Sequence, residues 1–428
     1  MHLRSSRRLR AAVVGATALI VALTGCTSSA PEFTYDPPQQ VNGQLPDDLT
    51  AQMQAAVEQA ITATGASGAI VGVWVPWSGE WVTGFGTQAK GDDTKVTKDM
   101  SFRIADVTRM MTCDVLYGMA DDGKVKLDAP VTKYVSGVAD LSDITLLDLC
   151  NGTSGVGSSE AAVKPYLLNT PDRVWAPLQL ASFGLGQQRG PAHTAYRDSD
   201  AGYLMLGMAL ERISGESASQ LISQYVTTPL GLKSTSLPGA AGAVPKPAPA
   251  LKGAYLPLAE DGTYDCAKPV DITESSASIG YTDSGVVSTI TDLGRYAQAE
   301  ARQALRAKDA KPARFASPLP AAPGAPAWYQ ATGGAYLVGS MIGQHGWVPG
   351  YATSAYSDPA TGFTVAVTLN DSSAGSAPAA YLAWELAAIA SKAPAAKGQT
   401  APQFGLPFTA EQYAQQMANA AICQPPAQ

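Results

Sequence analysis

Three aspartates and one arginine are among the side chains in this sequence that could do chemistry. Asp106 and Arg109 are three residues apart at the start of a helix-patterned segment, and Asp198 and Asp200 lie further along the chain. The i,i+3 spacing suits an ion pair on one helix face, and the helix dipole favours a carboxylate at a helix N-terminus. If the three carboxylates converge beside Arg109, they form an acidic floor. Such a floor suits a cationic group, a hard divalent ion held by oxygens, or a general acid and base.

Nucleophilic catalysis by serine has no recognisable motif here. No serine is followed by a lysine three residues later, and no GxSxG sequence occurs. A guanidinium has a pKa above about 12, so Arg109 stays protonated and cannot act as a base. Asp106 could attack a carbonyl only through an anhydride, which is a poor route to amide hydrolysis. We therefore interpret the pair first as a structural salt bridge, with a binding or catalytic role as the alternative.

The hydrophobic patterns predict the elements that must position these residues. Strands are expected before the Asp106 helix and again near the C-terminus, and they can join into one antiparallel sheet flanked by helices. A mostly helical region, at about 126–280, is inserted between them, which gives an α/β (α+β) fold class. The expected strands are 69–75, 80–85, 334–342, 351–357 and 363–369, the expected helices include 46–64, 106–121, 377–391 and one capped by Thr289, and 307–327 is expected to be an exposed loop.

The N-terminus has the pattern of a bacterial lipoprotein signal peptide. Four arginines precede an apolar stretch at 11–23, which is too short to span a bilayer comfortably. It ends in Leu-Thr-Gly-Cys, so we expect residues 1–25 to be removed and Cys26 to carry the lipid. Residues 26–45, rich in Ser, Pro and Gln, are expected to form a tether. The predicted location is the outer face of the cell membrane, within the cell envelope.

The charge of the predicted mature chain is strongly negative. Removal of four of the 29 Lys+Arg residues leaves 25 against 36 acidic residues, so the net charge is 25 − 36 = −11. Such a surface repels nucleic acid and disfavours a polybasic grip on anionic lipid. We therefore expect membrane attachment through the acyl chains on Cys26 and no nucleic-acid partner. Peptidoglycan or an envelope protein is the expected kind of partner.

The cysteines and histidines limit the covalent and metal chemistry. With Cys26 lipidated, four cysteines remain in an oxidising compartment, and they allow three disulfide pairings. A Cys266–Cys423 pairing would attach the C-terminal tail, 393–428, to the body. Free buried thiols are the alternative. Of three histidines, His2 is removed, so we expect no zinc cluster, and no cofactor is expected.

Six phrases in order resemble class C β-lactamases, low-molecular-weight penicillin-binding proteins and related esterases. The phrase FRIADVTR ends at Arg109 and is similar to the family's segment with the S-x-x-K motif. The resemblance covers about 47–391, so we predict a β-lactamase-related domain at 46–392. The other phrases are DGKVKLD at 122–128, ITLLDLCNGTSG at 144–155, YRDSDAGYLMLG at 196–207, GVVST at 285–289 and GQHGWVPG at 343–350.

The resemblance implies that every catalytic side chain of the family is replaced. The serine position is Asp106 and the lysine position is Arg109. The third-motif Lys or His is Gln344, although Gly346 is retained. The tyrosine and asparagine of the second motif are replaced by Asp198 and Asp200.

The family fold also suggests a disulfide. It would place Cys113 in the helix that begins at Asp106 and Cys150 in a helix packed against it. We therefore favour the pairings Cys113–Cys150 and Cys266–Cys423.

Three functions are compatible with this pattern. The first is a catalytically inactive binding protein of the envelope, with a cell-wall, envelope-protein or cationic ligand. The second is an esterase or peptidase with a rebuilt, aspartate-based centre. The third is a scaffold whose tail and surface bind partners while the cleft is idle. His193, His345, Tyr196 and Trp347 are interpreted as structural residues, although the two aromatic ones could also line the cleft.

Overall fold

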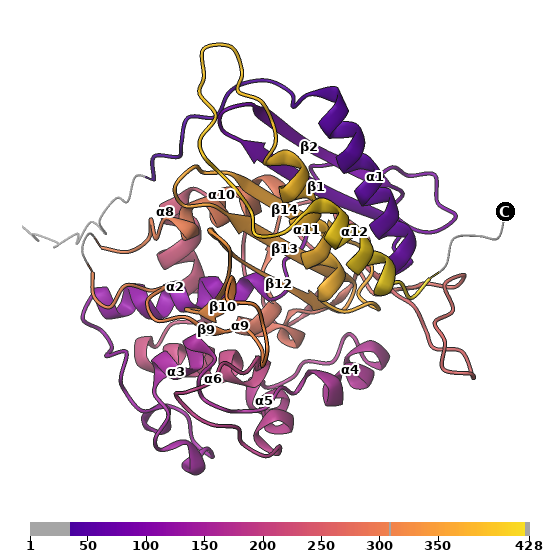
Figure 1. The fold of residues 1–428 in the computed structure, drawn as a ribbon. Helices are drawn as coiled ribbons and strands as arrows, with labels where there is room; N and C mark the ends of the chain where they lie inside the picture. The colour runs from indigo at the N-terminus through magenta and orange to yellow at the C-terminus, as the bar shows by residue number, and fades with distance from the viewer. Residues whose placement is uncertain (1–34, 308–309, 424–428) are drawn as a thin grey trace, which may run out of the picture. The chain divides into compact units, whose positions relative to one another are not determined.

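A single antiparallel sheet forms the centre of the molecule. The structure is a computed structural model that describes residues 35–307 and 310–423. The N-terminal strands β1 and β2 lie beside the C-terminal strand β14, which confirms that the terminal strands join into one sheet (Figure 1). In spatial order the strands are β2 (Gly79–Gly86), β1 (Gly68–Val75), β14 (Thr364–Leu369), β13 (Tyr351–Ser357), β12 (Met341–Val348), β11 (Ala335–Val338), β10 (Tyr329–Thr332) and β9 (Leu319–Pro320).

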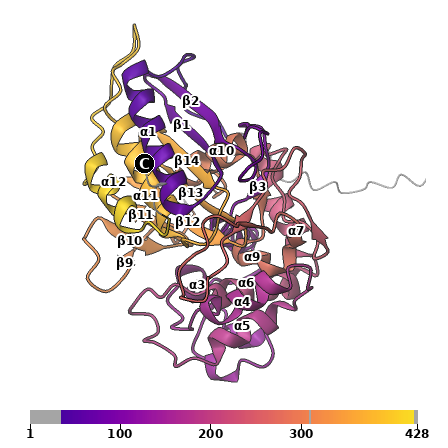
Figure 2. The ribbon, with the colours of Figure 1, turned by 90° about the vertical axis from the view of Figure 1, so that its right-hand side faces the viewer.

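Helices cover both faces of this sheet. The helices α1 (Asp47–Thr64), α11 (Ala377–Ala390) and α12 (Ala410–Asn419) lie on one face, and α10 (Ile290–Ala301) lies on the other (Figure 2). Because side chains alternate along a strand, Val71 and Val73 of β1 belong to one core and Ile70 to the other. Burial on both faces explains why β1 is an almost continuous apolar run.

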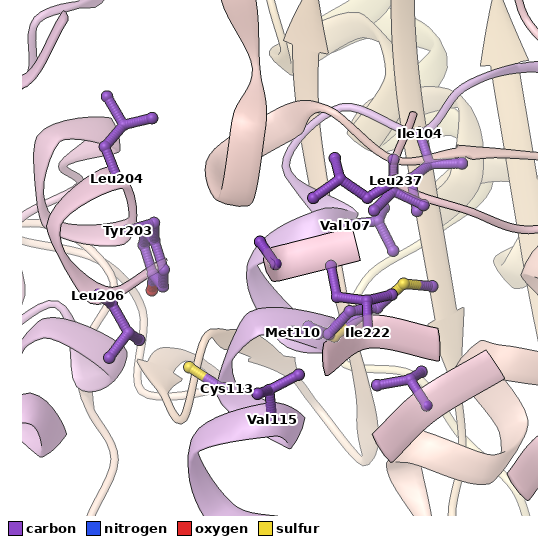
Figure 3. Close-up of a cluster of buried hydrophobic side chains, with 14 of the residues drawn as sticks. Ile104, Val107, Met110, Cys113, Val115, Tyr203, Leu204, Leu206, Ile222 and Leu237 are labelled. Atoms are coloured by element: carbon purple, nitrogen blue, oxygen red, sulfur yellow. The ribbon is translucent and has the colours of Figure 1, made fainter. Parts of the chain in front are cut away.

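The helix α2 (Val107–Asp121) lies at the heart of the second core. Its side chains contact α6 (Asp200–Ser214) on one side and the segments carrying Ile222 and Leu237 on the other (Figure 3). The remaining helices of the inserted region are α3 (Leu146–Asn151), α4 (Glu160–Asn169), α5 (Pro177–Leu185), α7 (Ala218–Ile222), α8 (Thr228–Leu230) and α9 (Tyr281–Ser284). Short strand pairs join β3 (Phe102–Arg103) to β8 (Val287–Ser288), β4 (Gly242–Ala243) to β7 (Ser275–Ser276) and β5 (Ala254–Tyr255) to β6 (Val270–Asp271).

Two details of the C-terminal half differ from the sequence-based expectation. The single strand expected at 334–342 is a hairpin, because Gly339 adopts φ 63° and turns the chain between β11 and β12. The segment 307–327, expected to be an exposed loop, contributes strand β9 and buries Arg314. The composition of the segment suggested exposure because the two carboxylates that neutralise Arg314 are distant in sequence. They belong to Asp114 and Glu300.

Two disulfides tie distant segments together, and both are the pairings favoured from the sequence. Cys113 of α2 is bonded to Cys150 of α3, and Cys266 is bonded to Cys423 beyond α12. The tail also packs through Tyr413 and Met417, which are buried. None of the helices in the described ranges is long and apolar enough to cross a bilayer. The expected signal peptide and Cys26 lie outside the described residues.

We predict that Arg314→Met destabilises the protein by about 3–5 kcal/mol, because it leaves two buried carboxylates without their counter-ion. Arg314 pairs with Asp114 and, at 2.6 Å, with Glu300, and all three side chains are at most 2% exposed. The measurement is urea unfolding. The control is Lys268→Met, whose 81% exposed amine pairs with Asp265 and should matter by less than about 1 kcal/mol. Equal, small effects of both variants would contradict the buried ion cluster.

Candidate functional site

The start of α2 presents Asp106 to a cleft between the sheet and the helical region. Ala105, which is fully buried, adopts φ 50°, a left-handed conformation that is unusual for a residue with a side chain. This conformation is retained because its surroundings fix it: the backbone N–H of Ile104 donates to the carbonyl of Val286. The chain therefore turns sharply just before Asp106, the N-terminal flanking residue of α2.

Arg109 is the centre of the site, and all three of its guanidinium nitrogens are engaged. Nε donates to Asp283 at 2.7 Å, Nη1 contacts Asp198 at 2.5 Å, and Nη2 lies 3.2 Å from Asp106. The Arg109 side chain is only 3% exposed, and its guanidinium lies 5.0 Å from the ring centre of Tyr203. The expected i,i+3 ion pair with Asp106 is present, and Asp198 joins it.

Asp200 lines the same cleft but makes a different set of contacts. It is the first residue of α6, and its Oδ1 accepts hydrogen bonds from the Ser158 hydroxyl at 2.8 Å and the Ser159 backbone N–H at 2.6 Å. These bonds attach the start of α6 to the start of α4. Asp200 therefore holds one wall of the cleft, and it makes no direct ion pair with Arg109 among the contacts of the described residues.

The two residues of the third motif have different environments on β12. The buried amide of Gln344 donates to the carbonyl of Gly334 at 3.0 Å, and Gln344 is not part of the cleft lining. Gly346 lies directly against Asp106, where an added Cβ would be 2.1 Å from the Asp106 Cγ. Only glycine fits at this position while Asp106 keeps its place.

The aromatic and histidine residues have separate roles. Trp347 lines the cleft, and its indole N–H donates to the Glu160 carboxylate. Tyr196 instead packs on Tyr336, with their hydroxyls 3.1 Å apart. His345 stacks on Tyr336 and contacts the Tyr356 hydroxyl at 2.7 Å. Burial lowers the pKa of His345 to about 4, so it is neutral at physiological pH.

The cleft is lined by both acidic and apolar side chains. It holds about 40 Å³ of space for water-sized groups, and its charged lining consists of Arg109 and four carboxylates. Within the described ranges, no three His, Cys, Asp or Glu side chains are arranged to hold a metal ion. The charged lining groups are Asp106, Arg109, Glu160, Asp200 and Asp283, and the apolar ones are Val163, Leu167, Leu180, Leu204, Ile279, Trp347, Val348 and Pro349.

Burial and mutual repulsion change the proton affinities of these groups. Burial raises the pKa of Asp106 well above its ordinary value, although Arg109 opposes the shift. Burial also raises the pKa of Asp283 to about 6, and it raises the pKa values of Asp200 and Glu160. Burial lowers the pKa of Arg109, but the surrounding carboxylates raise it by more, so the pKa lies above its ordinary value. Arg109 is therefore a permanent cation.

Sequence reasoning missed two members of the site, Asp283 and Glu160. Asp283 lies two residues before the GVVST phrase that begins at Gly285, and this proximity was the only signal that it lies near the cleft. Glu160 begins α4, and no motif surrounds it. His193 lies apart from the cleft lining and contacts Asp148 at 3.0 Å.

We predict that Asp283→Asn changes how stability depends on pH. The pKa of Asp283 is about 6 in the folded chain against 3.8 ordinarily, so the folded state binds this proton more tightly. The resulting stabilisation is complete below about pH 4 and is lost as the pH rises through about 6. Asparagine does not titrate, so Asp283→Asn should remove the part of the fall in unfolding free energy with rising pH that comes from this group. Urea unfolding of the variant and the wild type from about pH 4 to 7 measures the difference. The exposed-site variant Asp128→Asn is the control, and parallel curves for Asp283→Asn and wild type would refute the assignment.

Curated relatives match part of the chain. The D-alanyl-D-alanine-carboxypeptidase/endopeptidase AmpH of Escherichia coli K12 is 29% identical over 223 residues, which are 50% of this chain and 52% of AmpH. Penicillin-binding protein 4 of Amycolatopsis lactamdurans is 28% identical over 185 residues, which are 38% and 47% of the two chains. The chain thus spans about half the length of the curated relatives it matches.

Solved structures share the fold over a larger part of the chain. A D-stereospecific amidohydrolase from Streptomyces sp. has a TM-score of 0.65 at 23% identity and covers 76% of this chain and 95% of its own. The D-amino acid amidase from Ochrobactrum anthropi SV3 has a TM-score of 0.62 at 21% identity, with 76% and 92% covered. The family model described as Beta-lactamase matches residues 53–389. With its sheet, its inserted helical region and this match over most of its length, the chain belongs to the beta-lactamase family.

Proposed function

We propose that this chain is a non-catalytic member of the beta-lactamase family that binds a ligand in its cleft without forming a covalent bond. The observation that carries the proposal is the environment of Arg109, which is paired with three carboxylates where the family places a lysine beside its serine. A guanidinium in this environment cannot accept the proton of a nucleophile. The neighbouring position, Asp106, has no hydroxyl to acylate.

The charge of the cleft also argues against the family's usual ligands. Penicillins and D-alanyl peptides present a carboxylate, and four carboxylates line this cleft. The one lining cation, Arg109, already has each nitrogen engaged by an aspartate. An incoming carboxylate would therefore be repelled without gaining a free donor from Arg109. A cationic ligand, part of the cell wall or of an envelope protein, is the proposed occupant.

A second candidate function is an ester or peptide hydrolase with an aspartate-based centre. The observation in its favour is the pair of raised carboxyl pKa values beside Arg109, with that of Asp283 near 6. Carboxyls that exchange protons near neutral pH are suited to general acid–base catalysis. This function ranks second because both groups are ion-paired with Arg109, which competes for the lone pairs that a base must use.

The proposal extends to the location of the protein. We propose export and lipid attachment at Cys26, on the strength of the basic segment, the apolar stretch at 11–23 and the Leu-Thr-Gly-Cys sequence. The segment 26–45 would then hold the domain away from the membrane surface.

The non-catalytic proposal predicts no covalent labelling of the purified protein by a fluorescent penicillin or a fluorophosphonate. A penicillin-binding protein labelled in parallel serves as the positive control, and heat-denatured protein shows the background. A labelled band would overturn the proposal. Turnover of ester or D-alanyl substrates that disappears in both Asp106→Ala and Asp198→Ala would instead establish the second candidate function. Turnover unchanged in both variants would point to a contaminant.

The anchoring proposal predicts that Cys26→Ser moves the protein from the membrane fraction to the soluble envelope fraction, because the thiol that takes the lipid is gone. Immunoblots of fractionated cells provide the measurement. The matched control is Ser28→Ala, which changes a neighbouring residue and keeps the cysteine. If the Cys26→Ser protein stayed in the membrane fraction, the lipid anchor would be rejected.

A further inference from the structure

Carboxylates outnumber cations among the groups that line the cleft, and the nearby ammonium of Lys164, which lies 4.7 Å from the Trp347 ring centre, interacts with Glu160 from outside the lining. Four carboxylates, those of Asp106, Glu160, Asp200 and Asp283, line the cleft together with the single guanidinium of Arg109. The guanidinium is also shared with Asp198, which makes its shortest contact. A ligand that enters this cleft with a positive charge is therefore attracted, and one with a negative charge is repelled.

Asp106 stands out among these carboxylates because it lacks hydrogen bonds. Its side chain is about nine-tenths buried, at 10% exposure, and its one polar contact among the described residues is the 3.2 Å ion pair with Arg109. In the described part of the chain no group donates a hydrogen bond to it, and it does not cap α2. Asp200, by contrast, accepts two hydrogen bonds, and Asp283 accepts one from Arg109 at 2.7 Å.

A buried carboxylate without donors is costly, because burial removes the water that would otherwise donate to it. Asp106 lines the cleft, so a donor group in the cleft can reach it. An N–H group that carries positive charge would form the strongest kind of hydrogen bond available to this side chain.

The size and walls of the cleft restrict what that donor can be. The space of about 40 Å³ is larger than the roughly 10–15 Å³ that a cavity needs to hold one water. The lining also includes apolar side chains, among them Val163 and Leu167 of α4 and Leu180 of α5. A compact head group on a methylene chain matches both features, since the chain can pack along the apolar side chains.

We propose that the cleft binds a primary ammonium group at the end of an aliphatic chain, such as a lysine side chain of a peptide, with the ammonium donating to Asp106. The inference rests on the proposed non-catalytic function and names the ligand class of that site. The chain of the ligand lies against the apolar side chains of α4 and α5, and Glu160, which accepts a hydrogen bond from Trp347, lines the same cleft.

The test is calorimetric titration of the purified full-length protein with three small probes at pH 7. The ammonium probe is n-butylammonium, its neutral counterpart of similar length is 1-pentanol, and tetramethylammonium carries the charge without an N–H donor. We expect saturable binding of n-butylammonium and at least tenfold weaker binding of the other two. Equal binding of n-butylammonium and 1-pentanol would overturn the proposal, as would the absence of n-butylammonium binding.

Variants identify the carboxylate that is responsible. Asp106→Asn keeps the side-chain shape and removes the charge, so the affinity for n-butylammonium should fall about tenfold or more. Asp128→Asn, at an exposed site outside the cleft, should bind as wild type does. Glu160→Gln, at a position that packs against Trp347 and not in the helical core, should weaken binding by a smaller factor and provides a second readout if Asp106→Asn unfolds. Wild-type affinity in both cleft variants would overturn the proposal.

The non-catalytic function and the proposed ligand class can be disproved separately. Penicillin labelling would overturn the non-catalytic function itself, whatever the amine titration gives. If labelling is absent and the amine titration fails, only the ligand class is wrong.

Discussion

The structure around the cleft depends on one buried cation that is shared by three carboxylates. Arg109 and Asp106 belong to the start of α2, Asp198 precedes α6, and Asp283 lies in α9. A charge that is this deeply buried is tolerated only when it is paired and hydrogen-bonded. These ion pairs hold the three segments together around Arg109. The same contacts engage every nitrogen of the Arg109 guanidinium.

A second buried arginine performs the same task near the middle of α2. Arg314 comes from the segment between α10 and β9, pairs with Asp114 of α2, and donates at 2.7 Å to the carbonyl of Met110. The disulfide from Cys113 to α3 lies between the two clusters in sequence. The N-terminal half of the helix is thus fixed by covalent and ionic contacts. Such a helix is a rigid base for a cleft, whatever ligand the cleft receives.

Local patterns were enough to predict part of this arrangement. Alternating and continuous apolar runs predicted β1, β2, β13 and β14 because burial imposes a period of two on a strand. The spacing of Asp106 and Arg109 predicted their ion pair because both lie on one turn of a helix. The partners Asp283 and Asp114 could not be predicted in the same way. They lie 174 residues from Arg109 and 200 residues from Arg314, and only the tertiary fold brings the charges together.

The close contact between Gly346 and Asp106 limits how the residues of this pocket can change. A Cβ at residue 346 would lie 2.1 Å from the Asp106 Cγ, so strand β12 and helix α2 approach as closely as a bare backbone allows. The carboxylate therefore fills volume that the shorter side chain of a serine would leave empty. Replacing Asp106 with serine would widen the pocket and would also remove the negative charge at this position. The Asp106 carboxylate thus fills the space beside the bare backbone of Gly346, and a serine there would change the shape of the pocket together with its charge.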